Sequence, residues 1–198
     1  MQLLELIIWP RDPVHRLRRL RFTPGKINLI AGAPSTGKSS VWSILDFCLG
    51  SSALRVPVGA TRAHASWFGA RFVGNTNQML LARPNPDFAS ETEAFVIEGP
   101  ELEPPDSPSS NCDVKALKAF LNSRLTAFQI PKKKGWGRVS CRDVTALNIR
   151  AQYLLSNPSA VLFDERKTSS IHKIRAALPR LTQEDRPAEL SANRSALV

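Results

Sequence analysis

Short apolar and alternating segments in the first hundred residues predict a series of β-strands. The predicted strands cover residues 3–9, 19–22, 27–31, 66–73, 78–83 and 95–97. Residues 74–77 have the sequence Gly-Asn-Thr-Asn, which is typical of a turn, so residues 66–83 are predicted to form a hairpin. Residues 50–65 contain Pro57 and Gly59 and are expected to be a loop.

Apolar residues spaced three and four apart predict helices in other segments. The first helix follows residue 39 and would bury Val41, Ile44, Leu45, Cys48 and Leu49. The second follows residue 113 and would bury Val114, Leu117, Leu121, Leu125 and Phe128. Ser140 and Asp143 have the spacing of a capping box before a third apolar face at residues 144–155. A last helix is expected at residues 171–178, and the whole pattern predicts an α/β fold.

The composition of two further segments predicts how the chain is divided. Residues 99–113 are rich in proline, serine and acidic side chains, so they are expected to form a flexible acidic loop on the surface. Residues 182–198 are polar without periodicity and are expected to be a disordered tail. Residues 1–181 are therefore predicted to form one lobe.

One motif in this pattern points to a specific chemistry. Gly32, Ala33, Pro34, Ser35, Thr36, Gly37, Lys38 and Ser39 match the phosphate-loop pattern G-x-x-x-x-G-K-[ST], between a predicted strand and a predicted helix. In such a loop the backbone N–H groups, including that of Ser40, surround the phosphates of a nucleotide. Lys38 would reach the terminal phosphates, and the Ser39 hydroxyl would bind Mg²⁺. The sequence therefore predicts ATP and Mg²⁺ as cofactors.

The charge of the chain favours an acidic partner. The 198 residues carry a net charge of +10, and the sequence pI is about 10.2. Nucleic acid, bound through its charge without sequence specificity, is one expected partner. Residues 132–138 contain three lysines, Trp136 and Arg138. This run is either a contact to a phosphate backbone or a solvated loop between helices, and the sequence leaves both interpretations open.

The cysteine pattern and hydropathy give an expected compartment. Cys48, Cys112 and Cys141 lie far apart and form neither a zinc-binding pattern nor a disulfide framework, which is typical of a reducing cytoplasm. No apolar run approaches the roughly 20 residues that a membrane-spanning helix needs. The N-terminus also lacks the pattern of a secretion signal. A cytoplasmic location without a membrane partner is therefore expected.

Several stretches together carry a family resemblance. Residues 46–52 read Asp-Phe-Cys-Leu-Gly-Ser-Ser, and residues 66–69 read Ser-Trp-Phe-Gly. Ala82-Arg83 ends the second hairpin strand, and Gln152 is followed closely by Asn-Pro and Leu-Phe pairs. With the phosphate loop, these stretches resemble the N-terminal lobe of SMC-like ATP-binding-cassette ATPases. More narrowly, they resemble a bacterial family of such ATPases that is tied to conflict and defence operons.

The resemblance implies a P-loop NTPase fold with an antiparallel hairpin region and flanking helices. It also implies that Gln152 is the Q-loop glutamine, which contacts Mg²⁺ and the terminal phosphate. Full members of the family continue into a coiled coil and a C-terminal lobe that carries the catalytic glutamate. This chain has no coiled-coil heptads. The expectation is therefore an ATP-binding half-head that works as a homodimer or with a partner head, and that engages DNA or a partner protein.

Three alternatives remain open at this point. Residues 160–163 are apolar and precede Asp164-Glu165, which is the shape of a Walker B strand. In that interpretation Asp164 would hold Mg²⁺ through water and Glu165 would be the catalytic base of a complete, compact cassette. The second alternative is a small P-loop phosphotransferase. The third is a non-catalytic remnant that binds a partner or nucleic acid.

Overall fold

The computed structural model describes residues 1–34, 36–74, 76–125, 140–142 and 145. The elements in these residues are β1 (Gln2–Pro10), β2 (Arg18–Arg21), α1 (Ser40–Cys48), α2 (Ala60–His64), β3 (Ala65–Val73), β4 (Gln78–Pro84), β5 (Glu93–Gly99), β6 (Cys112–Asp113) and α3 (Val114–Leu125). The strands predicted at residues 3–9, 19–22, 66–73, 78–83 and 95–97 are confirmed to within a few residues. The helices that follow residues 39 and 113 are also confirmed, whereas the short helix α2 was not predicted.

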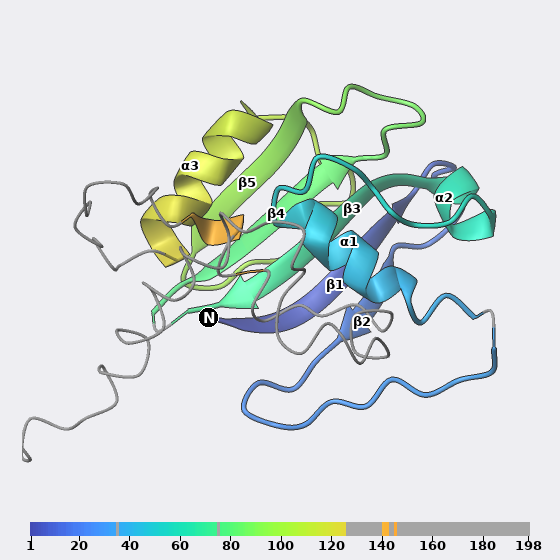
Figure 1. Ribbon diagram of the computed structural model, residues 1–198, viewed down its shortest axis with the longest axis horizontal. Coiled ribbons are helices and arrows are strands. Elements are labelled where there is room, and N and C mark those ends of the chain that lie inside the picture. The colour runs from blue at the N-terminus through green and yellow to red at the C-terminus, as the bar shows by residue number, and fades with distance from the viewer. Residues whose placement is uncertain (35, 75, 126–139, 143–144, 146–198) are drawn as a thin grey trace, which may run out of the picture.

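The strands of the described residues form one six-stranded sheet in the order β2-β1-β3-β4-β5-β6 (Figure 1). Each neighbouring pair is antiparallel. The predicted hairpin joins β3 to β4, and the Gly74 N–H donates to the Asn77 carbonyl at 2.8 Å to close its turn. The fold is thus a mixed α/β arrangement built on an antiparallel sheet.

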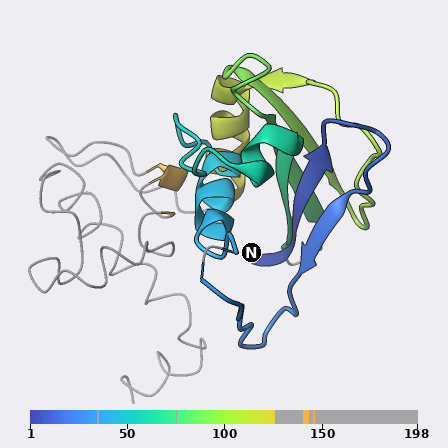
Figure 2. The ribbon, with the colours of Figure 1, turned by 90° about the vertical axis from the view of Figure 1, so that its right-hand side faces the viewer.

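The helices α1 and α3 pack on the same face of this sheet (Figure 2). Ile44 and Phe47 of α1 and Leu117 and Leu121 of α3 are each at most 2% exposed. Burial of each such side chain contributes about 1.5–3 kcal/mol. The α3 helix begins where the Asp113 carboxylate accepts the Ala116 N–H at 2.7 Å, an N-terminal cap. The described apolar positions predicted for these two helices therefore lie in the main core or pack against it.

The opposite face of the sheet is covered by the chain between β5 and β6. Ile7 and Trp9 are buried on this face, and Leu102 packs beside them. The Trp9 indole N–H donates to the Pro105 carbonyl at 2.8 Å. The segment at residues 99–113, expected to be a flexible loop, thus makes specific contacts with the sheet. Its mobility stays a prediction.

A buried carboxylate lies beside this second apolar cluster. Glu5 of β1 is fully buried, and its two oxygens accept hydrogen bonds from the Arg19 guanidinium. Arg71 Nη2 lies 3.1 Å from Glu5 Oε2, and Arg21 Nε lies 3.7 Å from Oε1. These four residues, the Glu5 cluster, tie β1 to both of its neighbouring strands.

The predicted strand at residues 27–31 is not formed, and this expectation was wrong. Residues 27–31 belong to no strand, and Ile27 and Leu29 are 99% and 89% exposed. A fully buried strand needs neighbours that satisfy its backbone N–H and C=O groups on both sides. In the described part of the chain the sheet ends at β2, and no strand pairs with residues 27–31. The apolar run has the composition of a strand but lacks a pairing partner.

Replacing Gly69 of β3 by alanine is expected to destabilise the fold by about 1–3 kcal/mol. A Cβ atom at this position would lie 2.5 Å from Cζ3 of Trp9, whose ring is 1% exposed and anchored through its indole N–H. Urea denaturation would measure the loss. Gly59→Ala is the control, because no atom lies within 4 Å of its added Cβ. Equal stability of the two variants would contradict this packing.

Several predictions concern residues outside the described part of the chain. They are the basic run at residues 132–138, the apolar positions of the face predicted at residues 144–155, Gln152, Asp164, Glu165, the helix at 171–178 and the tail at 182–198. Phe128 and Asp143 also lie outside it. Among the helices that are described, none combines the length and the hydropathy that crossing a bilayer requires.

Candidate phosphate-binding site

The residues of the predicted phosphate loop form an exposed turn at the start of α1. Gly37 has φ of +82°, a left-handed conformation that glycine adopts without strain. The Ser40 N–H donates to the Gly37 carbonyl at 3.0 Å, and the Val41 N–H donates to the Lys38 carbonyl at 3.3 Å. These bonds start the helix directly behind Lys38 and Ser39. The left-handed conformation of Gly37 therefore lets the motif lead directly into α1.

The Lys38 side chain folds back over this loop. Its ammonium donates to the Gly32 carbonyl at 2.7 Å and to the Ala33 carbonyl, and it lies 3.4 Å from Thr36 Oγ1. The Thr36 hydroxyl in turn donates to the Ala33 carbonyl at 2.8 Å. Both ends of the loop thus converge on one ammonium group. The positive charge lies within the curve of the backbone.

The loop also presents polar groups that can receive an anion. The N–H groups of Gly37, Lys38 and Ser39 donate to no acceptor among the described residues. Ser39 occupies the N-cap position of α1, is exposed, and makes no side-chain capping hydrogen bond. Unused N–H groups at a helix N-terminus, next to an ammonium, favour phosphate. The exposed Ser39 hydroxyl is a ligand type that Mg²⁺ accepts. The residues present therefore fit a magnesium-bound nucleotide phosphate.

The helix behind the loop is fixed to the sheet by a buried arginine. Arg83 of β4 is 1% exposed and donates to the carbonyls of Phe47 and Ser51 at the end of α1 and to Glu91. Its guanidinium lies 3.8 Å from the centre of the Phe47 ring. Burial lowers the pKa of Arg83 from its ordinary value. A cation at a helix C-terminus interacts favourably with the helix dipole, so Arg83 holds α1 in place.

Two further contacts position α1. The Cys48 thiol is buried and donates to the Phe68 carbonyl at 3.4 Å, and burial raises the pKa of this thiol to about 12. Arg142 Nη1 lies 2.6 Å from Asp46 Oδ1 and ties the described residues 140–142 to the helix. Arg83 stands out in the sequence only as part of the Ala82-Arg83 pair that resembles the family, and no sequence pattern predicted a role for Arg142. The alternation of side chains along β4 was the signal that was missed. Arg83 follows Met79 and Leu81 at steps of two residues, so its side chain faces the same core as theirs.

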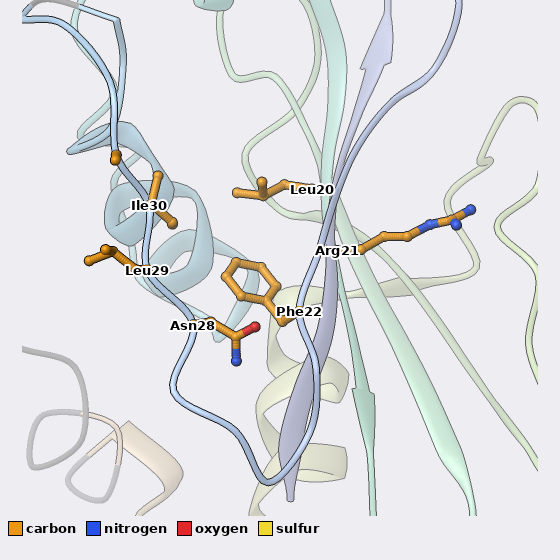
Figure 3. Close-up of a pocket in the computed structure, with 7 residues that line it drawn as sticks. Leu20, Arg21, Phe22, Asn28, Leu29 and Ile30 are labelled. Atoms are coloured by element: carbon orange, nitrogen blue, oxygen red, sulfur yellow. The ribbon is translucent and has the colours of Figure 1, made fainter.

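A pocket of about 250 Å³ lies between β2 and the segment that leads into the loop (Figure 3). Leu20 and Phe22 point toward residues 28–31, whereas Arg21 points away from them. Asn28 closes the turn before this segment, because its amide pairs with the N–H and the carbonyl of Thr23. The incoming segment therefore runs beside β2 but stays separated from it by this pocket.

The structure brings together most of the predicted site residues and leaves others outside its description. Gly32, Ala33, Pro34, Thr36, Gly37, Lys38, Ser39 and Ser40 form the loop and the start of α1. Ser35, Gln152 and Glu165 lie outside the described residues. Within the described ranges no cluster of three or more His, Cys, Asp or Glu side chains could hold a metal. Of the two residues predicted to bind Mg²⁺, Ser39 is described and Gln152 is not.

Comparison with known proteins adds no family assignment to this geometry. No family model matches the chain, and no curated protein matches it.

Proposed function

We propose that this chain is the ATP- and Mg²⁺-binding N-terminal half-head of an SMC-like ATPase, which couples nucleotide binding to the engagement of DNA or a partner protein. The observation that carries the proposal is the phosphate loop. Its Lys38 ammonium lies within the loop, and its N–H groups at Gly37, Lys38 and Ser39 have no acceptor among the described residues. Magnesium, when bound with ATP, would neutralise charge on the terminal phosphates.

The exposed apolar groups around the loop support the half-head interpretation. Ile27 and Leu29 precede the loop and are 99% and 89% exposed, and Trp42 on α1 is 46% exposed. An apolar surface of this kind next to a binding loop is typical of a protein interaction site. A second lobe or a partner head that supplies a strand beside residues 27–31 would bury these side chains.

The chain alone is expected to bind ATP but to release phosphate very slowly. Phosphoryl transfer needs a group that positions the attacking water as well as charge stabilisation around the terminal phosphate. The loop supplies only the second of these. Phosphate release should be measured with purified chain at several concentrations and again with Glu165→Gln. Robust turnover that Glu165→Gln abolishes would contradict the half-head and favour a complete, compact cassette.

A further inference from the structure

A second pocket, separate from the phosphate loop in its lining residues, opens between the β1–β2 connection and α2. It has a volume of about 440 Å³. Its apolar wall is formed by Ile8, Pro10, Leu17 and Ala65. Its polar lining is formed by His15, Arg16, Arg18, Thr61 and His64. A hollow of this size with an apolar wall is typical of a ligand site, and we refer to it as the basic pocket.

The walls of the basic pocket are held by specific hydrogen bonds. The Arg11 N–H donates to the His64 carbonyl at 2.7 Å, which joins the β1–β2 connection to α2. Asn85 is fully buried, and its side-chain amide donates to the carbonyls of Arg62 and Ala65 at 2.7 and 2.9 Å. The Arg62 guanidinium in turn pairs with both oxygens of Asp87. The pocket is therefore part of the folded framework.

The charge of the basic pocket is uncompensated within the described residues. No carboxylate side chain is among the described residues that line it, and Asp87, close to α2, is paired with Arg62. Arg16 and Arg18 form no ion pair in the described part of the chain. Two exposed guanidinium groups that line one pocket without acidic partners among the described residues attract phosphate groups.

We propose that the basic pocket binds a nucleotide unit of a single-stranded nucleic acid. Arg16 and Arg18 would contact the backbone phosphates, and a base would lie against the apolar wall. The imidazole rings of His15 and His64 provide planar surfaces on which an unpaired base can stack. A base inside a duplex is not available to enter a pocket, so the hollow shape favours a single strand. The basic pocket would be the place where the DNA partner of the proposed function binds. This assignment does not depend on the phosphate loop.

Fluorescence anisotropy with a labelled oligothymidylate of about 16 nucleotides tests this assignment. The double variant Arg16→Gln/Arg18→Gln is expected to bind about tenfold more weakly or worse than the wild type at low salt. Because each phosphate contact to a single strand contributes about 0.7 to the salt slope, losing two should reduce that slope by about 1.4. Ala60 also lines the pocket and is exposed. Ala60→Trp, which would fill the pocket without changing the charge, should therefore weaken binding as well.

The matched control is Lys26→Gln/Arg55→Gln, which removes two positive charges at exposed positions outside the pocket lining. Equal losses in the control and pocket double variants, or full binding by Ala60→Trp, would overturn the assignment. Stronger binding of a duplex of the same length, or competition by AMP as effective as by the unlabelled strand, would also overturn it. Lys38→Ala should keep its affinity for the oligothymidylate. Failure of MgATP binding alone would therefore reject the proposed function and leave this site standing.

Discussion

Glu5→Gln is expected to lower the free energy of unfolding by about 3–5 kcal/mol, the range for breaking one side of a buried ion pair. The carboxylate is fully buried and accepts two hydrogen bonds from Arg19, with Arg71 at 3.1 Å. A neutral amide would deprive both guanidinium groups of the buried carboxylate charge and leave Arg19 only its exposed partner Glu103. Urea denaturation at neutral pH would measure the difference from the wild type.

Glu103→Gln is the matched control for this effect. It makes the same chemical change in another partner of Arg19, but the Glu103 side chain is 76% exposed and lies 3.3 Å from the guanidinium. Exposed pairs of this kind contribute roughly 0–1 kcal/mol, so the control should stay close to the wild type. Similar losses in the two variants would show that burial does not set the strength of the Glu5 cluster.

The stabilisation by Glu5 should also depend on pH in a defined direction. Burial raises the pKa of this carboxyl, but the hydrogen bond and charge of Arg19, with Arg71 and Arg21, outweigh burial and hold the pKa below its ordinary value of 4.5. The unfolded chain therefore takes up this proton first as the pH falls. The advantage of wild type over Glu5→Gln should be complete above about pH 4.5 and should shrink below it. An advantage that grows on acidification would contradict this assignment.

Lys38→Ala is expected to weaken MgATP binding by about 1.5–3 kcal/mol, or roughly 10–150-fold in Kd. The ammonium lies within the loop, where it donates to the carbonyls of Gly32 and Ala33. Its removal takes away the charged donor that a terminal phosphate would meet. The hydrogen bonds described for the side chain lie within the loop itself, so the variant should remain folded. Isothermal titration calorimetry would give the two affinities.

Lys26→Ala provides the control for the change in charge. Lys26 is exposed and lies in the turn that precedes the loop, outside the phosphate motif. Its replacement lowers the net charge as much as Lys38→Ala does and should leave the MgATP affinity unchanged. Equal affinities of wild type and Lys38→Ala would remove the phosphate assignment. Equal losses in the two variants would attribute the effect to net charge alone.

Local sequence patterns predicted most of the described fold because the responsible interactions are themselves local. The alternation of β3 and β4 and the turn at residues 74–77 fix a hairpin whose apolar side chains meet the core. The five apolar positions predicted for the first helix lie in the main core or pack against it. Residues 27–31 were assigned wrongly because a buried strand also requires a neighbour, which composition does not report. Sheet order depends on such long-range pairing.

For the candidate site, too, the sequence predicted the local part and missed the contacts between distant residues. The phosphate motif specifies its own loop, because Gly37 adopts the left-handed conformation and Lys38 folds over the backbone within the motif. The side chains that hold α1 in place come from distant positions, and no short pattern links Arg83 or Arg142 to the loop. The basic pocket was missed for a related reason. Its residues lie in two segments about 45 residues apart, which are brought together by the pairing of β1 with β3 and by the hydrogen bond between Arg11 and His64.

The central claim is that the N–H groups of the loop at Gly37, Lys38 and Ser39 receive the phosphates of a magnesium-bound nucleotide. The most direct test is a titration of the isotopically labelled chain with MgATP, followed through its backbone amide resonances. We expect saturable chemical-shift changes that are largest at Gly37, Lys38 and Ser39 and that become weaker without Mg²⁺. A folded spectrum that MgATP leaves unchanged at these three amides would contradict it.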